Sequence, residues 1–127
     1  MKHIIMSIAF AMSFPAMTAE PDTTAKQEIE HLMAHLASSG CQFNRNGSWY
    51  NASRAVSHLN RKYEYLLDRK LAPTAEAFIE RAASESSASG KPYLVKCPGQ
   101  PETQSGEWFR SALATFRKET TGAEKQP

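Results

Sequence analysis

The stretch CQFNRNGSWYN, residues 41–51, has the pattern of two short strands folded back on each other at the dipeptide Asn46-Gly47. A two-residue type I′ turn requires a positive φ at both central positions, and Asn and Gly tolerate that conformation at the lowest cost. An amphipathic segment follows at once. The sequence therefore predicts a β-hairpin that leads directly into a helix, and the rest of the chain can be arranged around this hairpin.

The first 19 residues have the composition of an export signal. A basic start at Lys2 and His3 precedes an apolar run over 4–14 and a small-residue exit over 15–19. That run is much shorter than the roughly 20 residues that a membrane-spanning helix needs. We expect a secretory signal peptide cleaved after Ala19, a periplasmic mature protein and no membrane span after the signal is removed.

The charge balance gives no sign of a nucleic-acid partner. The chain of 127 residues has 15 Lys and Arg against 13 Asp and Glu, a formal net charge of +2. Domains that bind nucleic acid usually show a strongly basic balance. We therefore expect one small domain over 20–118 that does not bind nucleic acid.

Two cysteines, Cys41 and Cys97, are present in a chain that is expected to leave the cytosol. One intramolecular disulfide is the natural interpretation, worth about 4 kcal/mol at most because it closes a long loop. The alternative is a pair of free redox thiols, but the chain lacks the Cys-x-x-Cys spacing. A disulfide would also require the strand that begins near Cys41 to run antiparallel to the strand that ends near Cys97.

Apolar residues recur at helical spacing in four segments, near 24–38, 52–71, 74–84 and 105–118, and residues 93–97 have the composition of a strand. The predicted fold class is α+β, with about four helices packed on a small three-stranded antiparallel sheet. Residues 101–106 are expected to form a loop. Nothing apolar is left after Lys118, so we expect a disordered tail over 119–127.

Two histidines, His31 and His35, share one face of the first predicted helix with Glu28. Two His and a carboxylate could hold zinc. The alternative is an ordinary solvated helix face, because no fourth ligand can be named. We predict no cofactor and no metal site.

A second line of polar residues follows one flank of the helix over 52–71: His58, Lys62, Tyr65 and Arg69, with Arg54 and Arg61 beside it. Long cationic side chains often cover the edge of an apolar stripe. Such a flank could also receive an acidic or carboxylate-bearing partner. For Arg45, next to the hairpin turn, the two alternatives are a bidentate pair with a carboxylate such as Glu76 and a direct contact with a ligand.

A serine hydrolase is one catalytic alternative, with His58 serving Ser84, Ser86, Ser87 or Ser89 and with Glu76 or Glu80 orienting the imidazole. The chain has no strand-turn-helix nucleophile elbow. Serines in such a loop commonly make local backbone hydrogen bonds. We therefore predict that the protein is not an enzyme.

Four motifs together resemble the YfeK-like family of small bacterial periplasmic proteins of unknown function: FxRNG at 43–47, AxxAxxHLxxK at 52–62, TAExFI at 74–79 and SSxSGKPY at 86–93. The resemblance covers nearly the whole mature domain. It implies a secreted, periplasmic domain of Gram-negative bacteria and supplies no residue role. Separately, Ser89-Gly90-x-x-Tyr93 is similar to the loop by which unrelated, β-rich periplasmic lysozyme inhibitors enter the lysozyme cleft.

The leading hypothesis is a non-catalytic binding or interaction module of the cell envelope, whose partner is an unidentified envelope protein or cell-wall component. The alternatives are an inhibitor of a lysozyme-type cell-wall hydrolase acting through Ser89 to Tyr93, and a small periplasmic hydrolase using His58 and a loop serine. The candidate binding residues are Arg45, His58, Lys62, Ser86, Ser87, Ser89, Lys91 and Tyr93.

Overall fold

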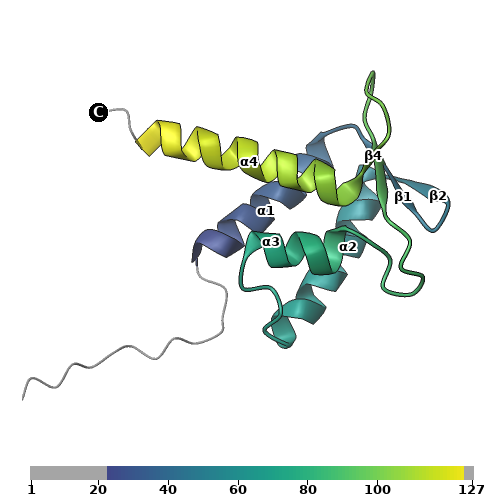
Figure 1. Ribbon diagram of the computed structural model, residues 1–127, viewed down its shortest axis with the longest axis horizontal. Helices are drawn as coiled ribbons and strands as arrows, with labels where there is room; N and C mark the ends of the chain where they lie inside the picture. Colours follow the sequence, from purple (N-terminus) through teal and green to yellow (C-terminus); the bar gives the residue numbers. More distant parts are fainter. Residues whose placement is uncertain (1–22, 125–127) are drawn as a thin grey trace, which may run out of the picture.

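The computed structural model describes residues 23–124, so the predicted signal peptide over 1–19 lies outside the described residues. Helices and strands alternate in short groups along the chain (Figure 1). The elements are α1 (Thr23–Ser38), β1 (Gln42–Arg45), β2 (Ser48–Asn51), α2 (Ala52–Asp68), α3 (Ala75–Phe78), the π-helix η1 (Ile79–Ala83), β3 (Leu94–Lys96), β4 (Thr103–Gln104) and α4 (Ser105–Glu124).

The predicted hairpin is confirmed. Asn46 and Gly47 have φ values of 52° and 86°, and Arg45 pairs with Ser48 across the turn. The Gly47 amide donates a 3.1 Å hydrogen bond to Asn44 Oδ1. At the other end of β2, Asn51 Oδ1 accepts a 2.9 Å bond from the Arg54 amide and caps α2. The turn and the cap together fix the direction in which α2 leaves the sheet.

The sheet has four strands in the order β2-β1-β3-β4, and all neighbouring strands are antiparallel. The prediction of three strands was wrong because Thr103–Gln104, which was expected to be loop, pairs with Leu94 and Val95. A strand of two residues is too short to show the alternation by which a sequence reveals strands. The hairpin strand β2 forms one edge of the sheet.

The predicted disulfide joins Cys41 to Cys97, with the two Cα atoms 4.1 Å apart. It connects the residue before β1 to the residue after β3, two strands that pair antiparallel with Phe43 opposite Val95. Phe43, Val95 and Tyr93 are almost fully buried. The antiparallel pairing of β1 with β3 and the burial of Phe43, Tyr93 and Val95 both agree with the prediction.

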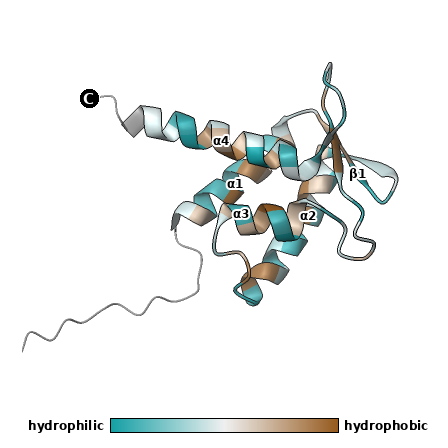
Figure 2. Cartoon of the chain, viewed as in Figure 1, coloured by the Kyte–Doolittle hydropathy of each residue, from teal (hydrophilic) through white to brown (hydrophobic). Residues whose placement is uncertain are grey.

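The helices pack around one core next to the sheet (Figure 1). In Figure 2, hydrophobic segments of α1 and α3 lie toward the middle of the molecule, and α4 crosses α1. No described helix combines the length and the apolar composition that crossing a membrane requires. The largest fully buried side chains are Tyr93, Phe43, Phe78, Phe109, Ile29, Leu32, Leu36, Leu59, Ile79 and Val95.

The third predicted helix begins as α3 and widens into the π-helix η1. Ser84 at its end donates a 2.7 Å hydrogen bond to the Ile79 carbonyl, five residues earlier. Gly106 in the first turn of α4 lies so close that a Cβ atom there would be 2.8 Å from Ser84 Oγ. A side chain at position 106 would therefore separate η1 from α4.

The last helix is longer than predicted. The segment over 119–127 was expected to be disordered, but α4 continues to Glu124. Residues 117–122 are exposed, and Thr120 Oγ1 donates to the carbonyls of Phe116 and Arg117. Backbone hydrogen bonding thus extends the helix beyond its last contact with the core, which a prediction from apolar residues alone does not detect.

Candidate functional site

Four of the eight predicted site residues form one hydrogen-bonded network. Arg45 at the end of β1 contacts His58 on α2, with Arg45 Nη1 2.7 Å from His58 Nδ1. His58 Nε2 lies 3.1 Å from the hydroxyl oxygen of Tyr93, just before β3. Lys62 Nζ, one helical turn after His58, donates to that same oxygen at 3.1 Å and to the Glu85 carbonyl at 3.1 Å.

The donors in this network determine the tautomer of His58. A guanidinium can only donate, so Nδ1 of His58 accepts from Arg45 and the imidazole proton is on Nε2. Nε2 then donates to the hydroxyl oxygen of Tyr93, which also accepts from Lys62. The Tyr93 proton and the remaining N–H groups of Arg45 and Lys62 have no acceptor within this network. It is therefore rich in donors and lacks acceptors.

The pKa shifts agree with that arrangement. Burial, followed by the charges of Arg45, Lys62 and Arg61, lowers the pKa of His58 to about 4. Burial also lowers the pKa of Lys62, an effect that Glu85 opposes and Arg45 reinforces. Burial raises the pKa of Tyr93, against the effect of Arg45. At neutral pH the network thus contains a neutral imidazole and a neutral phenol among fixed cations.

More cationic groups lie around the network. The guanidinium carbons of Arg45 and Arg54 lie 5.1 Å and 5.4 Å from the ring centroid of Tyr50. A hydrogen bond with Arg45 is the main cause of a lowered pKa at Tyr50. Among the side chains that the structure describes, no carboxylate oxygen lies within 4.0 Å of a side-chain nitrogen of Arg45, Arg54, Arg61 or Lys62. A more distant carboxylate, that of Glu85, still acts on Lys62.

Two surface hollows meet at this cluster. The first, which we call the hairpin hollow, has a volume of about 380 Å³ and is lined by Arg45, Tyr50 and the loop at 86–88. The second, the helix hollow, has about 420 Å³ and is lined by Arg61, Tyr65, Leu66 and Arg81. His58, Lys62 and Ser87 line both hollows.

The loop serines attach the loop to the hairpin. Ser86 is buried, and its Oγ accepts a 3.2 Å bond from Asn46 Nδ2 and bonds from the amides of Ala88 and Ser89. Ser89 Oγ donates to Asn46 Oδ1 at 2.6 Å. Ser86 and Ser89 thus shape the loop, while Ser87 lies exposed in both hollows. Lys91 is exposed and lines neither hollow.

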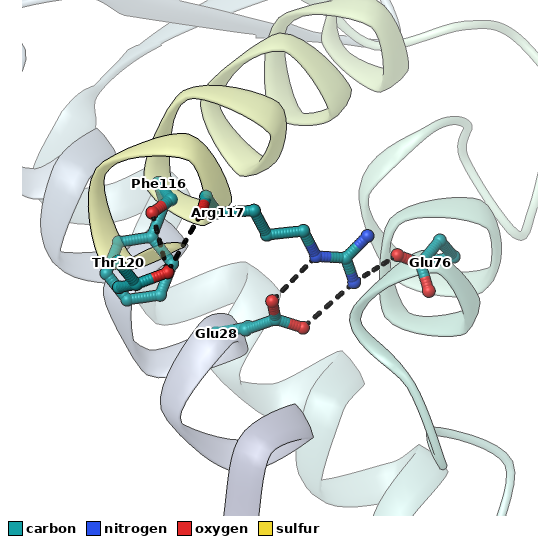
Figure 3. A network of polar contacts seen from close by, with 5 residues as sticks. All are labelled: Glu28, Glu76, Phe116, Arg117 and Thr120. Carbon is teal, nitrogen blue, oxygen red and sulfur yellow. Dashed lines mark hydrogen bonds and ion pairs between the residues drawn. The ribbon is translucent and has the colours of Figure 1, made fainter. Parts of the chain in front are cut away.

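The predicted pair of Arg45 with Glu76 is wrong, because Glu76 pairs with Arg117 instead (Figure 3). Arg117 Nε and Nη2 also donate to the two carboxylate oxygens of Glu28, at 2.7 Å and 2.9 Å. The hydrogen bond with Glu28 is the main cause of a raised pKa at Arg117. We call Glu28, Glu76 and Arg117 the Arg117 cluster. It ties α1, α3 and α4 together, and Arg117 did not stand out in the sequence.

The face of α1 that carries Glu28, His31 and His35 is not simply solvated, as one alternative held. Glu28 is buried, His31 stacks on Phe116 with 3.8 Å between ring centroids, and His35 stacks on Trp108 at 5.1 Å. The two imidazole planes are stacked and within 5° of parallel, so their lone pairs do not converge on a common point. Among the described residues, no group of three His, Cys, Asp or Glu side chains is placed to hold a metal ion.

The two alternative functions, a serine hydrolase and an inhibitor of a lysozyme-type hydrolase, each require a particular arrangement of His58 or of the loop that ends at Tyr93. The hydrogen bonds of the His58 imidazole go to Arg45 and Tyr93, and among the described residues none joins it to a loop serine. Tyr93 is only 1% exposed. Its ring packs inside the domain, with its centroid 4.9 Å from that of Phe43, whereas residues 87–92 of the loop are exposed.

The fold and the site define a small disulfide-linked α+β domain with an unneutralised cationic surface. A family model described as a family of unknown function (DUF5329) matches residues 23–117, and the chain belongs to this family. It is 37% identical over 95 residues to the uncharacterized protein YfeK of Salmonella typhimurium (strain LT2), covering 73% of this chain and 77% of the relative. This confirms the YfeK-like resemblance.

No solved structure matches the chain. Neither the family description nor the relative's name states an activity, and nothing in them suggests catalysis. The disulfide is consistent with an exported protein, because such bonds form and persist in oxidising compartments. The function therefore has to be inferred from the site.

Proposed function

We propose that this protein is a non-catalytic binding module of the cell envelope, and that its ligand presents an anionic group to the hairpin hollow. The observation that carries the proposal is the set of four cations around a neutral histidine, none of which lies within 4.0 Å of a carboxylate in the described part of the chain. The envelope location and the periplasm are part of the proposal, which the disulfide supports.

Like charges held close together raise the free energy of the folded state, because each cation repels its neighbours. An anion in the hairpin hollow would relieve that repulsion. Arg45 and Lys62 are already oriented by bonds to His58 and Tyr93, so little side-chain freedom would be lost when they donate to a ligand. Both side chains are also partly buried, which strengthens their interaction with an anion compared with fully exposed charges.

The same contacts favour binding over catalysis. A general base works best when its pKa lies near the operating pH. The pKa of His58 is lowered to about 4, and both of its ring nitrogens already have partners. His58 is therefore better suited to position Arg45 and Tyr93 than to accept a proton from a substrate at neutral pH.

Nuclear magnetic resonance with inorganic phosphate and N-acetylglutamate as probes tests this proposal. The amide signals of residues 44–48, 58–62 and 85–93 should shift in a saturable way. The double variant Arg45→Gln/Lys62→Gln should weaken the binding by about tenfold or more, which corresponds to 1.4 kcal/mol per factor of ten. A matched control, Lys96→Gln/Lys118→Gln, removes the same charge from exposed positions outside both hollows.

Shifts scattered over the whole surface, or equal binding by the two double variants, would overturn the proposal. Both outcomes would mean that the probes respond to net charge rather than to this site. Thermal unfolding of each variant should precede the titration, so that a loss of binding is not confused with a loss of folding.

A further inference from the structure

The two hollows lie next to each other, because His58, Lys62 and Ser87 line both of them. We propose, on the basis of the proposed function, that the ligand is linear and carries two oxyanion groups. Arg45 holds one in the hairpin hollow, Arg61 holds the other in the helix hollow, and Lys62 lies between them.

Arg61 is the cation of the helix hollow that is available to bind an anion. Its side chain is exposed, and among the described residues it takes part in no hydrogen bond or ion pair. The other cation there, Arg81, already donates to the Leu71 carbonyl and holds the turn that follows α2. A second anion would therefore find a guanidinium at Arg61 that makes no hydrogen bond to the network around Arg45, although its charge acts on His58.

The two hollows together extend along α2. His58 lines both hollows and Tyr65 lines the helix hollow, and seven residues of α-helix separate them along α2. At 1.5 Å per residue this is about 10 Å. An extended peptide rises about 3.3 Å per residue, so three to four residues cover the distance. One carboxylate cannot reach both ends, but two acidic groups in a short extended chain can.

The lining of the helix hollow also indicates which kind of neutral group the ligand carries. Tyr65 is 55% exposed, and Leu66 lies beside it in the lining. The guanidinium carbon of Arg69 lies 3.5 Å from the centroid of the Tyr65 ring. Tyr65 and Leu66 therefore offer apolar surface beyond Arg61 along α2, against which a neutral part of the ligand can pack.

Isothermal titration calorimetry with defined peptides tests the two-anion ligand. The probes are Ac-Glu-Ala-Ala-Glu-NH₂, its two single-acid analogues with one Glu replaced by Gln, and Ac-pSer-Ala-Ala-pSer-NH₂. We expect the two-acid peptide to bind at least about tenfold more tightly than either single-acid analogue, because the second contact becomes intramolecular. The phosphoserine peptide separates a carboxylate ligand from a phosphate ligand.

Two variants locate the second contact. Arg61→Gln should abolish the advantage of the two-acid peptide while single-acid binding at Arg45 is retained, and Lys118→Gln should change neither. Both positions are exposed on helices, so both variants should fold. If Arg61→Gln leaves the advantage intact, the assignment of the second anion to Arg61 is wrong.

The proposal can fail separately from the proposed function. Equal binding of one-acid and two-acid peptides, with phosphate still shifting the hairpin signals, would overturn the two-anion ligand and leave a single anion site. Absence of binding by every peptide and by phosphate would overturn both.

Discussion

Two arginines, Arg117 and Arg45, each join different elements of the fold, and they do so with opposite chemistry. Arg117 links α4 to α1 and α3 through two carboxylates (Figure 3). Arg45 links β1 to α2 through the neutral imidazole of His58, and its guanidinium also lies near the ring of Tyr50 on β2. The charge of Arg117 is neutralised inside the molecule, whereas the charge of Arg45 is not.

The difference separates structural arginines from arginines available to a ligand. An arginine that serves only the fold brings its counter-charge with it, because an unpaired and partly buried charge costs free energy. Arg45 lies instead among Arg54, Arg61 and Lys62, and no described carboxylate is paired with any of them. A ligand from outside the chain could supply that counter-charge.

Breaking the Arg117 cluster should have the largest effect on stability. The substitution Arg117→Met leaves the Glu28 carboxylate, only 7% exposed, without its bidentate partner. We expect a loss of about 2 kcal/mol in the free energy of unfolding, measured by urea denaturation. The effect stays below that of a fully buried pair because the Arg117 side chain is 47% exposed.

The double variant Glu28→Gln/Arg117→Met is the control, and it should recover part of the loss because no buried charge remains. The matched change Arg45→Gln should alter the free energy of unfolding by less than about 1 kcal/mol, since it removes repulsion as well as a hydrogen bond. Similar losses for Arg117→Met and Arg45→Gln would contradict the division of roles between the two arginines.

The part of the site that local patterns define could be predicted from the sequence. Asn46-Gly47 predicts the hairpin that places Arg45, and the helical period along α2 puts His58 and Lys62 on the same flank. The disulfide followed from two cysteines in a chain expected to be exported. Tyr50 went unnoticed as part of the site, because nothing in a four-residue strand indicates that two arginines lie over its ring.

Contacts between distant segments could not be predicted. Arg117 and Glu28 are 89 residues apart, and neither stands in a local pattern that names its partner. The sequence therefore assigned Glu76 to the wrong arginine and placed Glu28 on a solvated face. The two-residue strand β4 was missed for a related reason, since it exists only through its pairing with β3.

A change of pH should act on the Arg45 network in a defined direction. The folded pKa of His58 is lowered to about 4 from an ordinary value of 6.5, so the unfolded chain takes up this proton first as the pH falls. The contribution of His58 to stability should be constant above pH 7 and should decrease from about pH 6.5 to 4. In His58→Gln this part of the pH dependence should disappear.

The measurement is the free energy of unfolding of wild type and His58→Gln between pH 7.5 and 4. Only the difference between the two curves is used, because carboxylates titrate in both proteins. A difference that does not change with pH would mean that His58 has the same pKa in the folded and the unfolded state. Saturating phosphate should reduce the difference, since an anion in the hairpin hollow favours the protonated imidazole.

The smallest expected effect comes from giving the cationic site its own carboxylate. Ser87 is exposed and lines both hollows, so Ser87→Glu places an anion beside Lys62 and His58. We expect a gain of about 0.5 kcal/mol in the free energy of unfolding, the usual size of an exposed ion pair. The pKa of His58 should rise at the same time, and the affinity for Ac-Glu-Ala-Ala-Glu-NH₂ should fall.

The matched control is Ala114→Glu, which adds the same charge at an exposed position on α4 outside both hollows. If both variants lower the affinity equally, the peptide responds to net charge alone. If only Ser87→Glu does so and also stabilises the domain, an internal carboxylate has replaced the ligand. The new carboxylate at position 87 would then neutralise the cluster around Arg45 in the way that Glu28 and Glu76 neutralise Arg117. This result is expected if a partner normally neutralises the charge of the Arg45 cluster.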